Sequence, residues 1–152
     1  MTDIAKGTPQ VVEGPLVRDF TPRLLLAEDD AELRSFLAER FRSAGFEVVE
    51  AEDGTSVVEC LADSILNTHR GANFHLVISD IRMPGFTAFD VLRSARGALR
   101  ATPVILITGF GDRRTHERAQ LLGAAAVFDK PLDVDDLIGA ACRLLPQSQP
   151  NP

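Results

Sequence analysis

One carboxylate is placed where it could do chemistry, at the end of an otherwise apolar run. Residues 75–80 (HLVISD) end in Asp80, and the pair Pro84-Gly85 follows four residues later. A run of this length and type predicts a buried strand, and a Pro-Gly pair predicts the turn that leaves it. We therefore expect Asp80 at the carboxyl end of a central strand, the edge at which open α/β sheets bind ligands.

Other apolar runs end in the same way. Glu28 and Asp29 follow the run at 23–27, Thr108 follows the run at 104–107, and Lys130 follows the run at 124–128. Carboxylates that meet at one sheet edge repel each other and resist ionisation unless positive charge lies among them. A hard cation with oxygen ligands, such as Mg²⁺, would relieve this repulsion. The ammonium of Lys130 would suit a phosphoryl group.

Each of these features also has a purely structural explanation. The acidic run from Glu28 to Asp30 could be a helix start that the helix dipole favours. Thr108 could simply end a strand, and Lys130 could lie in an exposed turn. Asp80 is harder to explain in this way, because a carboxylate is most costly where its surroundings are apolar. The recurrence of polar residues at successive strand ends favours a common site.

Helical patterns separate the strands. Asp30 is placed to cap a first helix that ends at Gly45, and Asp133 to cap the last one. The fourth helix, from 111 to 122, is polar and rich in arginine. The apolar residues expected to face the core are Leu33, Phe36, Leu37, Phe41 and Ala44 in the first helix, Val57, Val58, Leu61 and Ile65 in the second, Ala88, Val91, Leu92, Ala95 and Leu99 in the third, Ala119, Leu121 and Leu122 in the fourth, and Val134, Leu137, Ile138, Ala141 and Leu145 in the fifth.

Alternation of five strands (23–27, 46–51, 75–80, 104–107 and 124–128) with these helices predicts a doubly wound α/β fold with a parallel sheet. We expect a flavodoxin-like (βα)5 arrangement with strand order 2-1-3-4-5. Residues 1–21 are expected to form a flexible N-terminal extension, 22–146 the folded domain, and 147–152 a polar tail.

Composition excludes several classes of protein. The chain has 152 residues and a formal net charge of −6, which argues against an extensive nucleic-acid-binding surface. No apolar stretch approaches the roughly 20 residues of a membrane span, and no signal peptide is evident. Cys60 and Cys142 have no metal-ligand spacing and fit reduced packing residues of a cytoplasmic protein. The histidines, His69, His75 and His116, show no such spacing either.

In order along the chain, the motifs LLLAEDD, VISDIRMPG, VILITG and FDKP resemble those of the receiver domain of two-component response regulators. We expect a stand-alone receiver, and the alternative is a receiver excised from a larger regulator or hybrid kinase. The resemblance implies that Asp80 is the phosphoacceptor for a sensor histidine kinase or a histidine phosphotransfer protein. It also implies that Asp29 and Asp80 bind Mg²⁺ directly, Glu28 through water and Arg82 through its main-chain carbonyl. Contacts to the phosphoryl group would come from Lys130, from Thr108 as the switch, and from the N–H of Gly109.

The chain departs from this pattern at one switch position. The family usually has an aromatic residue three positions before the lysine, where this chain has Val127. Alternation along a strand turns Val127 and Phe128 to opposite faces, so Phe128 would not replace the missing ring. Arg82 and Phe110 hold the two positions that, in the family, flank the water attacking the phosphoprotein. We expect Phe110 to exclude water and lengthen the lifetime of that species.

The expected function is therefore signalling rather than turnover of a substrate. The chain would catalyse only its own phosphorylation and dephosphorylation, and its output would be a protein contact. This contact would use the face formed by residues 112–145, which could also support a homodimer, and the arginine-rich part of that face suits an acidic partner. The alternatives are a Mg²⁺-dependent phosphohydrolase with an aspartyl nucleophile and a binding module that works without phosphorylation. The first would need an acid where this chain has Arg82.

Overall fold

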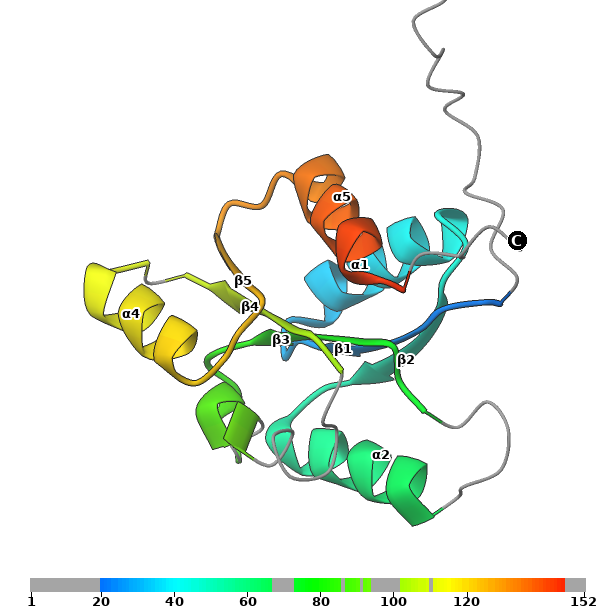
Figure 1. Cartoon of the computed structure of the whole chain (residues 1–152), viewed down its shortest axis with the longest axis horizontal. Helices are drawn as coiled ribbons and strands as arrows, with labels where there is room; N and C mark the ends of the chain where they lie inside the picture. Colours follow the sequence, from blue (N-terminus) through cyan, green and yellow to red (C-terminus); the bar gives the residue numbers. More distant parts are fainter. Residues whose placement is uncertain are drawn as a thin grey trace, which may run out of the picture.

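The architecture is a parallel sheet covered by helices on both faces (Figure 1). The computed structural model describes residues 20–66, 73–85, 87–90, 92–93, 102–109 and 111–146. Within these ranges five parallel strands lie in the order β2-β1-β3-β4-β5, which confirms the predicted fold and topology. The strands are β1 (Arg23–Ala27), β2 (Glu47–Ala51), β3 (Leu76–Asp80), β4 (Val104–Thr108) and β5 (Ala126–Asp129).

Helices cover both faces of the sheet. On one face lie α1 (Ala31–Ser43) and α5 (Val134–Leu144), and on the other lie α2 (Gly54–Leu66) and α4 (Arg113–Leu121), the latter beside the β5 edge (Figure 1). Of the helix predicted around residues 88–99, the described residues 88–90 and 92–93 are helical. The predicted tail, the extension up to residue 19, and the side chains of His69, Ile65, Val91, Ala95, Leu99 and Phe110 lie outside the described part of the chain.

Aspartates fix where the helices begin. The Asp30 carboxylate accepts hydrogen bonds from the N–H groups of Glu32 and Leu33, at 3.0 and 3.1 Å. Asp133 caps α5 and Asp112 caps α4 in the same manner. These contacts satisfy N–H groups that have no partner within the helix, which confirms the two predicted caps and adds a third. Because Asp30 follows β1 so closely, Glu28 and Asp29 are held at the strand end.

The central strands are buried on both sides. Every residue of β3 and β4 is buried, and the side chains alternate between two apolar clusters. Val77 and Leu106 pack on the side of α2, whereas Ile78 and Ile105 pack on the side of α1 and α5. Full coverage explains why these strands are continuous apolar runs instead of alternating ones. It also leaves Asp80 at the end of a strand with no exposed face.

Four predicted core positions are wrong, and one of them, Ala44, is exposed directly after α1. Phe36, Val58 and Leu121 are 47%, 37% and 79% exposed. In each of these helices the buried stripe is narrower than the apolar set. Leu37 and Val57, each one residue or about 100° from the exposed side chain, are fully buried, and so is Ala119, two residues before Leu121.

The fifth strand begins at Ala126, two residues later than predicted. The reason is that the Ala124 N–H still bonds to the carbonyl of Ala119 at the end of α4, at 2.9 Å. The Ala125 N–H then reaches the Val104 carbonyl at 2.8 Å, and the sheet pairing of β5 starts one residue further on. The last turn of α4 thus delays the strand.

Pro84-Gly85 forms the predicted turn after β3. Gly85 has a φ of +92°, a conformation that residues with a side chain rarely adopt. The carbonyl of Pro84 accepts a hydrogen bond from the Gly54 N–H at 2.9 Å, which ties this turn to the start of α2.

None of the helices in the described ranges is long and apolar enough to cross a membrane.

Burial of the central strands gives a stability prediction. Ile105 is fully buried in β4, and Ile105→Ala should lower the free energy of unfolding by about 2–5 kcal/mol, because lost contacts leave a cavity. Leu121→Ala, at an exposed site, should change it by less than about 0.5 kcal/mol. Urea unfolding followed by circular dichroism measures both values. Equal effects of the two substitutions would contradict the assigned core.

Candidate phosphoacceptor site at the carboxyl edge of the sheet

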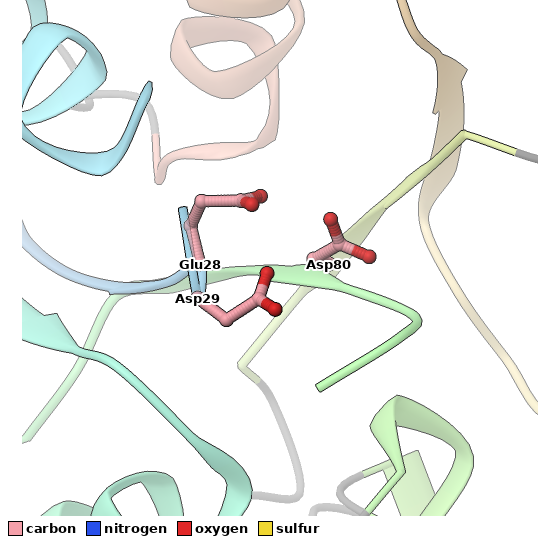
Figure 2. A group of neighbouring side chains, drawn as sticks. All are labelled: Glu28, Asp29 and Asp80. Carbon is pink, nitrogen blue, oxygen red and sulfur yellow. The ribbon is translucent and has the colours of Figure 1, made fainter. Parts of the chain in front are cut away.

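Three carboxylates meet where β1 and β3 end. Ala27 pairs with Ser79 in the sheet, so that the following residues, Glu28 and Asp80, come side by side. Figure 2 shows the side chains of Glu28, Asp29 and Asp80 directed toward a common space. Each offers an oxygen within 4.8 Å of an oxygen of the other two. The structure thus brings together the three acids that the sequence predicted at this edge.

Glu28 is the most deeply buried of the three. Its Oε1 accepts hydrogen bonds from the Asp30 N–H and the Lys130 ammonium, both at 3.3 Å. Its Oε2 is buried and has no hydrogen-bond donor within the described residues. Burial, followed by the adjacent Asp80 carboxylate, raises the pKa of Glu28 from 4.5 to about 7. Ionisation of Glu28 is therefore unfavourable unless a cation binds beside it.

Asp80 is held from two sides. Its Oδ1 accepts the N–H of Arg82 at 2.8 Å, and its Oδ2 accepts a short hydrogen bond from the Lys130 ammonium. The next backbone N–H, that of Ile81, bonds to the Ile107 carbonyl at 2.9 Å and keeps the strand end aligned with β4. Only 4% of Asp80 is exposed, so its orientation is set by these contacts and not by solvent.

Lys130 reaches the acids from the end of β5, the strand at one edge of the sheet. It follows β5, its N–H donates to the carbonyl of Thr108 at 2.8 Å, and its peptide bond to Pro131 is cis. Partial burial lowers the pKa of the ammonium, but hydrogen bonds and charge attraction with Asp80 and Glu28 outweigh this and raise it overall. Lys130 therefore stays charged and joins the end of β5 to the ends of β1 and β3.

The residues present fit a hard divalent cation. When all are ionised, three carboxylates and one ammonium leave a net charge of −2. The buried Glu28 Oε2 lacks a donor among the described residues, and a buried polar atom without a partner is unfavourable. Carboxylate oxygens are the ligands that Mg²⁺ prefers. A cation among them would offset both the charge and the missing contact.

The other predicted site residues lie around this cluster. Thr108 is buried at the end of β4, and Gly109 follows it next to the aliphatic part of Lys130, where a Cβ would lie 4.0 Å from Cδ. Arg82 is exposed immediately beyond β3. Val127 packs on the cluster of the α2 and α4 side and Phe128 on the opposite one, so the two face apart as predicted.

One positioning residue was not predicted. Arg34, in α1, donates from Nη1 to the carbonyl of Glu28 at 2.8 Å and forms an ion pair with Glu50 at 3.5 Å. It fixes the backbone that carries Glu28 and Asp29. The sequence carries only a weak signal for this role of Arg34, because an arginine four residues after the cap Asp30 is an ordinary helical surface residue. Only the fold places the end of β1 beside it.

One family model matches this chain. The model of the response regulator receiver domain matches residues 24–141, a range that covers the five strands except for Arg23 and includes the cluster described above. The transcriptional regulatory protein PdtaR of Mycobacterium tuberculosis is 39% identical over 119 residues, and CpxR of Escherichia coli is 32% identical over 126. These matches cover 78% and 83% of the chain, but 54% and 50% of the two relatives. The chain spans about half the length of these relatives.

Solved structures have the same fold. The non-phosphorylated receiver domain of HemR from Leptospira biflexa is 26% identical, with a TM-score of 0.69, and the match covers 86% of this chain and 98% of that domain. The chemotaxis response regulator CheY4 of Vibrio cholerae is 23% identical, with a TM-score of 0.68, over 83% of this chain and all of its own (100%), and supports the fold alone. The family match over residues 24–141, the sheet order and the acidic edge agree, and this chain belongs to the response regulator receiver domain family.

Proposed function

We propose that this chain accepts a phosphoryl group on Asp80 in a Mg²⁺-dependent reaction and thereby switches a protein-interaction surface. The donor is a sensor histidine kinase or a histidine phosphotransfer protein, and the reaction takes place in the cytoplasm. The observation that carries this proposal is the position of Asp80: a buried carboxylate at a strand end, hydrogen-bonded to Lys130 and grouped with Glu28 and Asp29.

In the transfer step an Asp80 carboxylate oxygen attacks phosphorus in line. The bond from this oxygen to phosphorus forms while the bond from phosphorus to the donor's histidine nitrogen breaks, and the electron pair remains on that nitrogen. Lys130 is already at Asp80 and offsets negative charge on the phosphoryl oxygens, so catalysis is mainly positioning and electrostatics. The N–H of Gly109 and the hydroxyl of Thr108 are further donors to the phosphoryl group.

Glu28, Asp29 and Asp80 would hold Mg²⁺, with the main-chain carbonyl of Arg82 as a further ligand. A bound Mg²⁺ supplies positive charge that neutralises the carboxylates and polarises the phosphoryl oxygens. The raised pKa of Glu28 and its unpartnered Oε2 support a cation at this site. Both features indicate that the described residues alone do not compensate the charge of the Glu28 carboxylate.

The output follows from the charge that phosphorylation adds. A phosphoryl group on Asp80 brings about one further negative charge and new acceptor oxygens, which draw the Thr108 hydroxyl inward. Thr108 lies at the junction of β4 with α4, so its movement biases the face formed by α4, β5 and α5. That face would bind a downstream protein or a second copy of the chain, and not nucleic acid or a membrane.

Catalysis is limited to the chain's own phosphorylation and dephosphorylation. A phosphohydrolase with an aspartyl nucleophile needs a second acid two residues further on, and Arg82 occupies that position with an exposed side chain. A binding module that works without phosphorylation would have no need for the buried charges of Glu28 and Asp80 or the partly buried ammonium of Lys130, which are costly to desolvate.

Incubation with acetyl phosphate and Mg²⁺ tests the proposal. Intact mass should show one added phosphoryl group on the wild type and none on Asp80→Asn or after chelation of Mg²⁺, because the acceptor or its counter-charge is then missing. Asp135→Asn, an exposed aspartate of α5, is the matched control and should be modified like the wild type. A wild type that stays unmodified by acetyl phosphate and by its cognate kinase would disprove the proposed function.

Burial of Glu28 predicts how stability depends on pH in the metal-free protein. The pKa of Glu28 is higher in the folded state (about 7) than in the unfolded one (4.5), so its contribution is complete below pH 4.5 and is lost as pH rises through 7. The stability gained by Glu28→Gln relative to the wild type should therefore grow by about 1–3 kcal/mol between pH 5 and pH 8.

Urea unfolding in the presence of a chelator measures this difference. Glu117→Gln, which changes an exposed glutamate of α4, should show no growth with pH. Addition of Mg²⁺ at pH 8 should stabilise the wild type more than Glu28→Gln, since the variant lacks one carboxylate. If the advantage of Glu28→Gln is the same at both pH values, the assigned cost of ionising Glu28 is wrong.

Phe110, which lies outside the described residues, is proposed to keep water from phosphorylated Asp80. Phe110→Ala should shorten the lifetime of the phosphoprotein about three- to tenfold, because a small side chain leaves room for the attacking water. Decay of the phosphorylated mass after removal of the donor measures this lifetime. Phe36→Ala, which removes an exposed aromatic ring of α1, is the control and should leave the decay unchanged. An unchanged decay in Phe110→Ala would contradict the proposed role of Phe110.

A further inference from the structure

Helix α4 is held to the sheet by little apolar packing. Ala119 is its one buried residue in the described structure, and Leu121 is 79% exposed. A helix that buries one small side chain loses little when it shifts, because the contact area is small. The polar contacts of α4 therefore carry a larger share of its attachment than is usual for a helix on a sheet.

One of these contacts joins α4 to β5. His116 Nε2 lies 2.9 Å from Asp129 Oδ1, and both side chains are partly exposed. The contact forms when Nε2 carries a proton, whether or not the ring is charged. Asp129 is the last residue of β5 and directly precedes Lys130. The pair thus connects α4 to the strand end that delivers the ammonium of the site.

Asp129 is also linked to Thr108 through the backbone. The two residues are partners in the pairing of β4 with β5, and the N–H of Lys130 donates to the Thr108 carbonyl at 2.8 Å. Asp129 is therefore next to two of the residues proposed to contact the phosphoryl group. A displacement of Thr108 toward Asp80 would therefore act directly on Asp129, its partner in the neighbouring strand.

The segment that follows Thr108 contacts the same carboxylate. A Cβ at Gly111 would overlap Oδ1 and Cγ of Asp129, so the carboxylate lies against the Gly111 backbone. It is thus held between His116 of α4 and the connection from β4 to α4. If this connection moves with Thr108, the position of the Asp129 carboxylate changes. A hydrogen bond of 2.9 Å weakens steeply with such a change.

Val127 does not provide a comparable link. It packs on the same side of the sheet as α4, but its aliphatic side chain has no group that donates or accepts a hydrogen bond. It can follow a movement only through packing. Asp129, two residues further along β5, has the charge and the direct contact with α4 that Val127 lacks.

We propose that the His116–Asp129 pair is the switch contact of this protein: phosphorylation of Asp80 weakens it and thereby loosens α4. This inference rests on the proposed function, because it takes the phosphoryl group on Asp80 as its trigger. His116 and Asp129 are positioning residues, since neither touches the phosphoryl group. The pair couples the site to the surface that the proposed function uses for output.

Amide hydrogen exchange of residues 113–121, measured by mass spectrometry with and without acetyl phosphate and Mg²⁺, tests the inference. In the wild type, exchange should speed up about two- to fivefold on phosphorylation, the range that loss of an exposed ion pair provides. His116→Ala and Asp129→Ala should exchange at this faster rate before phosphorylation and show no further change afterwards. Both should still gain one phosphoryl group by intact mass.

Two further variants separate the switch from a merely structural role. Glu117→Gln breaks the Arg113–Glu117 pair, which has the same length of 2.9 Å but lies within α4, and should respond like the wild type. His116→Lys supplies an N–H donor that can reach Asp129 and should restore the response that His116→Ala loses. A restored response is not expected if His116 only stabilises the helix.

The outcomes are distinguishable. Absence of phosphorylation in the wild type would disprove the proposed function, and this inference with it. Phosphorylation of the wild type without a change in α4 exchange would overturn the inference alone. A full response in His116→Ala and Asp129→Ala would also overturn it, because the signal would then bypass the pair.

Discussion

The structure depends on one ammonium that opposes three carboxylates. Lys130 contacts Asp80 and Glu28, and Asp29 lies beside them, so the acids repel each other more than one cation can offset. The ammonium comes from β5, whereas the carboxylates come from β1 and β3. Sheet pairing must therefore hold β5 in register with β4, and β4 with β3, for the charges to meet at all. The sheet serves the site as a rigid frame.

Much of this frame could be predicted from the sequence because its signals are local. Buried parallel strands are continuous apolar runs, and a residue such as Asp30 caps the helix that directly follows it. The three acids could be predicted for the same reason, since each one ends or follows a strand. The choice between Val57 and Val58 as the core residue could not, because both are apolar and only the packing of α2 on the sheet separates them.

The contacts that join distant elements had no such signal. Arg34 reaches the Glu28 carbonyl only because α1 turns back over the end of β1. Likewise, His116 and Asp129 meet because α4 begins at its cap Asp112 and passes beside the β5 edge. In the sequence His116 has no metal-ligand spacing and looks like a surface residue. The predicted alternation of Val127 and Phe128 held, since it follows from strand geometry alone.

Under the proposed function, charge and packing together account for the way in which a phosphoryl group at Asp80 would change a distant surface. The ionised site has a net charge of −2 before any phosphoryl group arrives, so a cation and a phosphoryl group favour each other's presence, and this coupling is reciprocal. The sheet and the helices α1 and α5 resist the resulting strain, because they bury large side chains such as Phe41 and Leu137. Helix α4 buries Ala119. On the proposed function, a movement at the site would therefore be accommodated at α4, where less packing is lost than at α1 or α5.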